Sequence, residues 1–98
     1  MIVIRVAYYT KPGKRDAFAK RLLDDGVMEA TRLEQGNAEY SFSLPLDKPD
    51  VVELLEIWES REAVEVHTGS PMFLHLREMK QDYVDHSDIV MFDAQITK

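Results

Sequence analysis

The chain has 98 residues, of which 45% are hydrophobic and 31% are charged, a composition typical of one globular domain spanning residues 1–98. Its 12 Lys and Arg against 18 Asp and Glu give a formal net charge of −6, which repels a phosphate backbone and argues against a nucleic-acid partner. The absence of cysteine excludes disulfides and thiolate chemistry, and no apolar run approaches the roughly 18 residues of a membrane helix.

The first predicted element is a strand over residues 2–9, which carries apolar side chains on both of its faces. This N-terminal stretch lacks the basic segment that precedes the apolar part of a signal peptide. We therefore expect no secretion, no membrane partner and a cytoplasmic location. Lys11-Pro12-Gly13 is typical of a turn after the strand.

Apolar residues at spacings of three and four predict one helix over residues 14–34. Its buried stripe comprises Ala19, Leu22, Leu23, Val27, Ala30 and Leu33. Gly26 falls on this stripe, either to let the helix approach another element closely or as a weak point costing up to about 1 kcal/mol. Gly36 is typical of the left-handed residue that ends a helix.

Strict alternation of apolar and polar residues predicts a strand over residues 38–46 with one face in water. Pro45 indicates a sheet edge or a strand end. After a turn at residues 47–50, a third strand is predicted over residues 51–59, in which Leu54, Glu56 and Trp58 share one face.

Ser60 and Ser70 are each typical helix caps, and Gly69 separates the two helices that they begin. The first helix is predicted over residues 61–68. The second starts at Pro71 and buries an apolar seam of Met72, Phe73, Leu76, Met79 and Tyr83. After a predicted turn at residues 85–88, the last strand covers residues 89–97 and is largely apolar on both faces.

The predicted order is β-α-β-β-α-β, which favours an α+β, ferredoxin-like fold: a four-stranded antiparallel sheet with helices on one face. Three of the four strands carry apolar residues on both faces, so the uncovered face needs a partner. A second copy of the chain is the simplest one. We predict a homodimer that packs sheet against sheet, as in a dimeric α+β barrel.

Two segments resemble the antibiotic biosynthesis monooxygenase family: LEQGNAEYSF, residues 33–42, and EIWESREAVEVHTGSP, residues 56–71. The residues that match the family pattern are, in order, Glu34, Gly36, Tyr40, Glu56, Trp58, Ser60, Ala63, His67, Ser70 and Pro71. The resemblance implies a dimeric ferredoxin-like fold. Some members of the family are oxygenases that act on quinols or polyketide aromatics without metal or flavin, so the resemblance implies such an activity as one expectation.

Two departures from the family pattern bear on the chemistry. The haem-degrading members have an asparagine in the first strand, and residues 2–9 contain none, which counts against haem chemistry. Met72 stands where the family commonly has a histidine, so we do not expect a mechanism that needs two histidines there. Another member isomerises a phosphorylated sugar derivative, and many have no known role.

The candidate catalytic residues are His67, Trp58 and Glu56. A histidine side chain ordinarily titrates near neutral pH and so suits proton transfer, although His67 is equally well explained as a buried residue that binds the backbone. Trp58 is either one wall of an aromatic-substrate pocket or a core residue. Glu56 is a general base if burial raises its pKa; otherwise it is an ion-pair partner or an exposed edge residue.

The candidate substrate-pocket residues are aromatic or apolar: Tyr40, Phe42, Phe73 and Leu54. Each is also consistent with core packing. The three histidines have no close metal-ligand spacing, and the chain has no phosphate loop or dinucleotide motif. We therefore predict no metal and no cofactor.

These residues support three hypotheses. The first is a cofactor-independent monooxygenase of a small electron-rich aromatic, a quinol or polyphenol, in which His67 or Glu56 removes a phenolic proton. The second is an isomerase of a small phosphorylated dione, which needs Arg61 or Arg77 to face the pocket. The third is a non-catalytic, dimeric ligand-binding protein, which a site packed without a void would favour.

Overall fold

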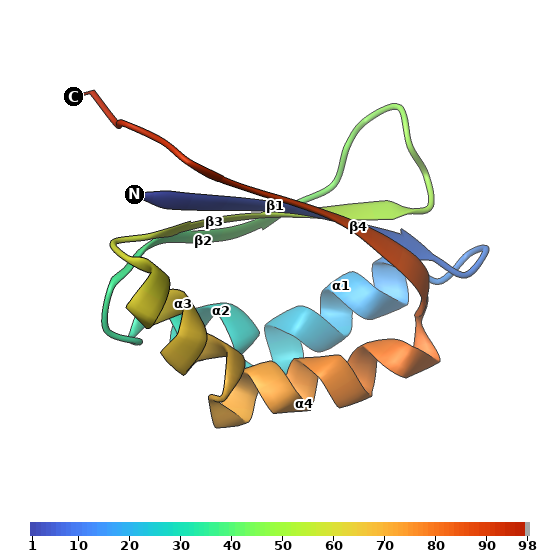
Figure 1. Cartoon of the computed structure of the whole chain (residues 1–98). Coiled ribbons are helices and arrows are strands. Elements are labelled where there is room, and N and C mark those ends of the chain that lie inside the picture. The colour runs from blue at the N-terminus through green and yellow to red at the C-terminus, as the bar shows by residue number, and fades with distance from the viewer. Residues whose placement is uncertain (98) are drawn as a thin grey trace.

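The computed structural model describes residues 1–97 as an antiparallel four-stranded sheet with helices packed on one of its faces (Figure 1). The elements in chain order are β1 (Ile2–Thr10), α1 (Arg15–Asp24), α2 (Val27–Arg32), β2 (Asn37–Ser43), β3 (Val51–Trp58), α3 (Arg61–Thr68), α4 (Pro71–Met79), a 3-10 turn (Lys80–Asp82) and β4 (Val84–Asp93). This arrangement confirms the predicted α+β, ferredoxin-like fold. No helix within residues 1–97 is long and apolar enough to cross a membrane.

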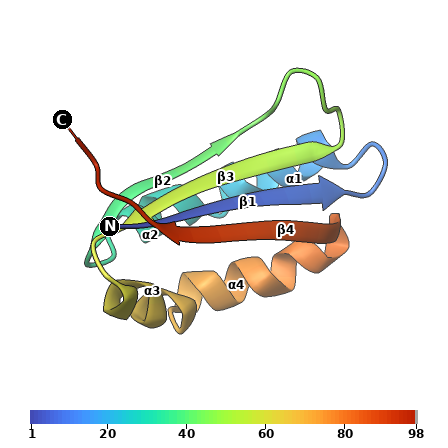
Figure 2. The same ribbon diagram turned by 45° about the horizontal axis from the view of Figure 1, so that its top comes forward.

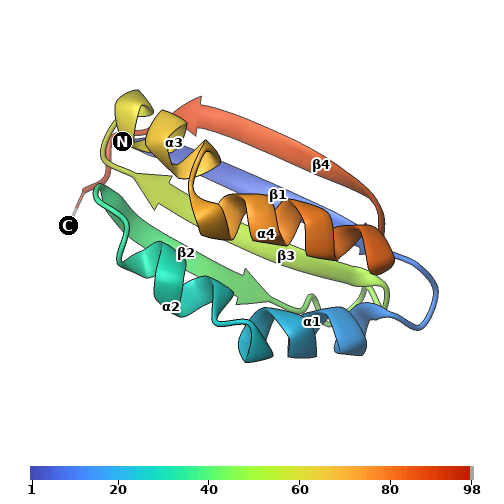
Figure 3. The ribbon, with the colours of Figure 1, turned by 90° about the horizontal axis from the view of Figure 1, so that it is seen from below.

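The strand order is β2-β3-β1-β4, so β1 lies between its partners β3 and β4 (Figure 2). In this register Ile4 lies opposite Glu56 on β3 and opposite Met91 on β4. Residues directly opposite each other share a face of the sheet. The side of β1 that carries Ile4 and Tyr8 therefore faces the helices, with α1 and α2 nearer to β2 and α3 and α4 nearer to β4 (Figure 3).

The prediction of one helix over residues 14–34 is wrong, because the chain turns at Gly26. Its φ of 68° lies in the left-handed region, which favours glycine and interrupts a helix. The break interrupts the predicted stripe, and Leu23 on α1 and Leu33 after α2 are 61% and 87% exposed. Of the two roles considered for Gly26, the structure agrees better with a weak point in the helix than with a close approach to another element. A Cβ there would touch only the Glu29 carboxylate, at 3.5 Å.

Two strands have different limits from those predicted. β4 begins at Val84, so residues 85–88 form part of a strand and no turn, and it ends at Asp93. The polar side chains at 86–88 pair with β1, where backbone hydrogen bonding outweighs their turn-forming preference at the solvated edge of the sheet. β2 ends at Ser43, and the two leucines beyond it, Leu44 and Leu46, are exposed.

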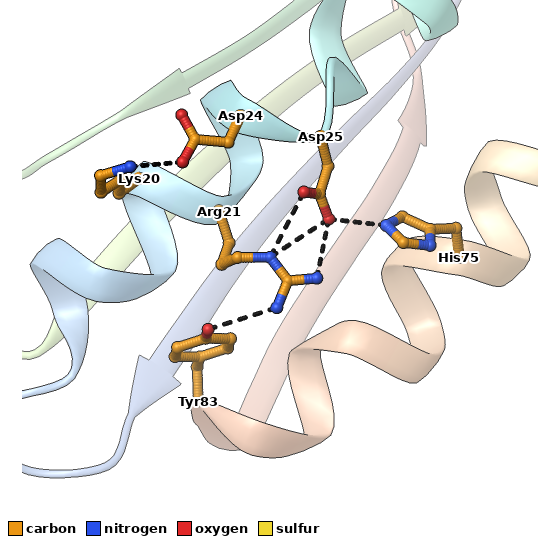
Figure 4. Close-up of polar contacts among 6 residues, drawn as sticks. All are labelled: Lys20, Arg21, Asp24, Asp25, His75 and Tyr83. Carbon is orange, nitrogen blue, oxygen red and sulfur yellow. Dashed lines mark hydrogen bonds and ion pairs between the residues drawn. The ribbon is translucent and has the colours of Figure 1, made fainter.

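A polar network joins α1 to the segment around α4 (Figure 4). Arg21 pairs with Asp25 at 2.9 Å and donates a hydrogen bond to the Tyr83 hydroxyl at 3.4 Å, while His75 Nε2 lies 2.7 Å from the Asp25 carboxylate. The hydrogen bonds from Arg21 and then His75 lower the pKa of Asp25 from 3.8 to about 2. The network holds together the two helical segments that cover the sheet.

The other face of the sheet has no helix over it (Figure 1). Its apolar side chains form a patch that we call the open-face patch: Val3, Leu55, Ile57, Val90 and Phe92. Val90, Phe92 and Leu55 are 57%, 44% and 37% exposed. The predicted apolar character of both faces is therefore present in the folded chain.

Candidate active site

β3 and α3 bring the three predicted catalytic residues together. Glu56 and Trp58 are two residues apart on β3 and so lie on the same face, under α3. Ser60 caps α3 by accepting a hydrogen bond from the backbone N–H of Ala63 at 3.1 Å. Near the other end of this helix, the imidazole of His67 lies against the Trp58 indole, with ring centroids 4.5 Å apart.

A buried chain of polar contacts runs through these residues. Trp58 Nε1 donates a hydrogen bond to Glu56 Oε1 at 3.0 Å, and the same oxygen lies 3.6 Å from His67 Nε2. The other ring nitrogen, Nδ1, lies 2.9 Å from Oε1 of Glu34. His67, Glu56 and Trp58 are 3%, 6% and 0% exposed. Each nitrogen of the imidazole thus faces a carboxylate, an arrangement that can hold and move a proton.

Glu56 has the environment of a general base. Burial raises its pKa above the usual 4.5, and the charge of Glu34 adds to the rise, whereas the hydrogen bond from Trp58 and the charge of His67 oppose it. Its partners are Trp58 and His67, and among residues 1–97 it forms no ion pair with Lys or Arg. The carboxyl group is therefore closer to taking up a proton near neutral pH than an exposed glutamate is.

Gly36 brings Glu34 within reach of His67. Its φ is 86°, and a Cβ at this position would lie only 2.6 Å from the Ala63 Cβ. Its carbonyl also accepts a hydrogen bond from the backbone N–H of Glu59 at 2.8 Å. The loop after α2 therefore lies directly on the start of α3, which gives a physical reason for the joint appearance of these residues in one sequence pattern.

A cavity of about 220 Å³ lies beside this polar chain, between the sheet and the α3–α4 pair. Its walls are largely apolar and come from β1, β4, α3 and α4: Ile4, Val6, Val64, Phe73, Ile89 and Met91. Its polar groups belong chiefly to Glu56, His67, Tyr8 and Lys80. The site therefore contains a void. A site packed without a void was the condition that favoured a protein without catalysis.

The structure divides the predicted site residues into two groups. Glu56, His67 and Phe73 line the cavity, and the ring centroids of His67 and Phe73 are 5.3 Å apart. Trp58, Tyr40 and Leu54 are buried and do not line it. Trp58 and Tyr40 instead pack against His67, Tyr40 with a centroid distance of 6.0 Å.

Phe42 lies apart from this site. It is half-buried and lines a separate hollow with Leu22 and Met28, on the α1–α2 side of the sheet. Within residues 1–97, no three His, Asp or Glu side chains are grouped so that they could hold a metal ion.

Three residues join the site that were not among the seven main candidates predicted from the sequence: Glu34, Tyr8 and Lys80. Glu34 belongs to the matched pattern, but its contact with α3 depends on the turn at Gly36. Tyr8 shares a strand face with other cavity residues, a signal that the alternation of β1 already contained. Lys80 follows Phe73 by seven residues, a spacing that places two side chains on one face of a helix.

The comparisons with known proteins agree with this fold. A model of the family described as antibiotic biosynthesis monooxygenase matches residues 1–79, which include Glu34, Glu56, Trp58 and His67. No curated protein matches the chain.

Several solved structures share the fold. One from Nitrosomonas europaea, assigned to the same family, is 22% identical with a TM-score of 0.87, and the match covers 98% of this chain and 100% of that one. One from Deinococcus radiodurans, also assigned to the family, is 19% identical with a TM-score of 0.86, covering 100% and 96%. A Mycobacterium tuberculosis protein is 23% identical with a TM-score of 0.85, covering 98% and 96%. The family model spans most of the sequence, and the chain belongs to the antibiotic biosynthesis monooxygenase family.

Proposed function

We propose that the protein is a cofactor-independent monooxygenase that oxidises a small electron-rich aromatic, a quinol or polyphenol, with molecular oxygen. The observation that carries the proposal is the buried Glu34–His67–Glu56 chain at the wall of a largely apolar cavity. A buried base beside an apolar cavity suits the deprotonation of a phenol. Membership of the family and the fold support a monooxygenase or a protein that binds a small molecule.

The proposed reaction balances without an external reductant. His67 or Glu56 takes the phenolic proton, and the phenolate passes one electron to oxygen. The phenoxyl radical and superoxide then combine at a ring carbon to form a peroxide. Loss of the ring proton and cleavage of the O–O bond leave a quinone and water, with one oxygen atom of O₂ in each. The substrate supplies all four electrons, and the protein contributes proton transfer and orientation.

The size of the cavity limits the substrate. Pockets for drug-sized ligands have volumes of roughly 300–1,000 Å³. The cavity beside His67, at about 220 Å³, is smaller and suits a single substituted ring. Phe73 supplies an aromatic wall, whereas Trp58 acts through its hydrogen bond to Glu56 and not by touching the ligand.

The isomerase hypothesis has less support. In the form predicted from the sequence, it needs Arg61 or Arg77 in the cavity to hold a phosphate, although Lys80 is a cation there. Arg61 instead lies 3.3 Å from Asp93 and is exposed, and Arg77 is also exposed and does not line the cavity. A ligand-binding role uses the same cavity, so turnover separates it from the monooxygenase.

Oxygen uptake by the purified protein tests the proposal. The substrates are a panel of quinols and polyphenols, with a metal chelator present throughout. We expect saturable uptake that falls at least about tenfold in kcat for His67→Ala, in line with the contribution of a general base. His86→Ala is the matched control: His86 is exposed on β4, stacks on Tyr9 with centroids 4.5 Å apart, and does not line the cavity.

The alternative outcomes point elsewhere. Unchanged uptake in His67→Ala would remove His67 from the mechanism. Saturable binding of the same compounds with no uptake by any of them would favour the ligand-binding role over the monooxygenase.

A further inference from the structure

The cavity has polar groups of opposite charge at its two ends. Glu56 and His67 lie at one end, and Tyr8 and Lys80 lie at the other. Ile4 is opposite Glu56 in the sheet, and Tyr8 follows it by four residues on β1. At about 3.3 Å per residue, the backbone positions of Ile4 and Tyr8 are about 13 Å apart along the strand. The wall between the two ends is largely apolar, so the cavity suits a ligand with one polar group at each end.

Lys80 is a cation without a counter-ion. It follows α4 directly and turns toward the sheet, with its Nζ 5.6 Å from the centroid of the Tyr8 ring. Among residues 1–97 its ammonium forms no hydrogen bond or ion pair. Burial, and after it the charge of Arg77, lowers the pKa of Lys80 below its usual 10.5. An anion that reached this position would therefore be bound by a charge that water solvates incompletely.

The acidic residues near the cavity do not pair with the Lys80 ammonium. Oε1 of Glu56, at the far end, accepts the hydrogen bond from Trp58 and faces His67. Glu34 is bound to the other nitrogen of His67. A single ammonium in an acidic protein, with formal net charge −6, matches a monoanion such as a carboxylate better than a phosphate of charge about −1.5 to −2.

We infer that Lys80 is the anion-binding residue of the cavity and that its ligand is a small aromatic carboxylate. The carboxylate pairs with Lys80 at the Tyr8 end, while the phenolic hydroxyl faces Glu56 and His67. This inference deepens the proposed function and rests on it for the reaction, whereas the binding preference is measurable by itself. Lys80 lies just beyond residues 1–79, which the family model matches, so the assignment comes from the cavity of this chain.

Binding without oxygen tests the inference. The probes are 2,5-dihydroxybenzoate and its methyl ester, which differ in charge at one end only, and calorimetry gives each dissociation constant. We expect the wild-type protein to bind the acid about tenfold more tightly than the ester, a difference of about 1.4 kcal/mol. Lys80→Met should abolish this preference by weakening binding of the acid alone, and Lys80→Arg should retain most of it.

Arg77→Met is the matched control. Arg77 is an exposed cation three residues before Lys80 that does not line the cavity, so this variant keeps the preference if direct pairing causes it. An equal loss in both Met variants would show a long-range effect of charge and overturn the inference. A Lys80 that serves only the contact with Tyr8 would alter stability and leave the ratio of acid to ester unchanged.

The wild-type ratio needs no variant, so the inference stays falsifiable if Lys80→Met fails to fold. Equal affinity for acid and ester in the wild-type protein would overturn it. A probe with phosphate in place of carboxylate that bound more tightly would overturn the carboxylate assignment.

Oxygen uptake with the same two probes separates this inference from the proposed function. A preference for the acid without uptake would leave Lys80 as an anion site and contradict the monooxygenase. Uptake of the ester with the same KM as the acid, in wild type and Lys80→Met alike, would support the monooxygenase and overturn the role of Lys80.

Discussion

Nδ1 of His67 and Oε1 of Glu34 lie 2.9 Å apart, although 33 positions separate these residues in the chain. The contact joins the loop after α2 to α3, and the side chains are only 4% and 18% exposed. A carboxylate on one nitrogen of an imidazole fixes the orientation of the ring and so determines where the other nitrogen points. In this site the other nitrogen, Nε2, points toward Glu56, which makes Glu34 a positioning residue.

Replacing Glu34 should destabilise the protein according to what the new side chain can accept. Glu34→Ala leaves a buried ring nitrogen without a partner, and we expect the free energy of unfolding to fall by about 1–3 kcal/mol. Glu34→Gln keeps an acceptor oxygen and should lose less. Urea denaturation measures both. The exposed neighbour Gln35 provides the control, and a Gln35→Ala variant as unstable as Glu34→Ala would contradict this role.

Glu56 should make the folded protein less stable as the pH rises from acid to neutral. Burial is the main reason that the pKa of Glu56 lies above 4.5 in the folded state. The folded state therefore binds a proton that the unfolded chain has already released. The stability that this proton provides is fully present below pH 4.5 and is lost as the pH rises through the raised value. Glu56→Gln should remove this part of the pH dependence while its amide oxygen still accepts from Trp58.

Urea denaturation at a series of pH values between 4 and 8 checks this sign. The control is Glu65→Gln, because Glu65 is exposed on α3 and outside the buried chain. The slope of stability against pH should flatten in Glu56→Gln and stay unchanged in Glu65→Gln. Parallel curves for wild type and Glu56→Gln would show that the carboxyl group has no shifted pKa in the folded protein.

The fold could be predicted from the sequence because the periodicity of apolar residues depends on local spacing. The alternation in β3 put Leu54, Glu56 and Trp58 on one face, and in the structure that face lies under the helices. The single helix over residues 14–34 was wrong because a left-handed φ at Gly26 is a property of the folded backbone. Periodicity alone could not distinguish that break from a close approach between helices.

The site was only partly predictable, for a related reason. Glu56, Trp58 and His67 lie on neighbouring elements and were proposed together. The role of Glu34 depends on a turn, and that of Lys80 on how the end of α4 packs over Tyr8. Tyr40 and Leu54 were predicted to line the pocket, but they fill the core beside it. Burial in a strand does not tell which residues border a void.

Gly36→Ala should destabilise the protein more than Gly13→Ala does. Both glycines have a φ that L side chains rarely adopt, 86° and 75°. A Cβ at Gly13 would meet nothing within 4 Å, whereas one at Gly36 would lie 2.6 Å from the Ala63 Cβ. We expect about 1–2 kcal/mol from the backbone in each case, and a further loss at Gly36 as α3 moves. Urea denaturation of the pair tests this, and equal losses would show that the Ala63 contact relaxes freely.

The open-face patch is the surface on which we propose that a second copy of the chain packs. Val90 and Phe92 on β4 and Leu55 on β3 present exposed apolar side chains on this face, whereas Ile4, Val6 and Trp58 are buried under the helices. An interface with twofold symmetry places the same patch on both subunits, so this surface is its own partner. Stable dimers bury roughly 800 Å² on each subunit.

Light scattering after size exclusion should therefore give twice the mass of the chain at micromolar concentration. Val90→Asp with Phe92→Asp places two carboxylates in the patch, where pairing would bury them without partners, and should shift the protein to monomer. Val66→Asp is the control, because Val66 is 72% exposed on α3 and lies on the helical side of the molecule. A wild-type monomer at this concentration would exclude the dimer. A double variant that stayed dimeric would move the interface to another surface, because two charges buried without partners in the patch would outweigh the apolar area that remains around them.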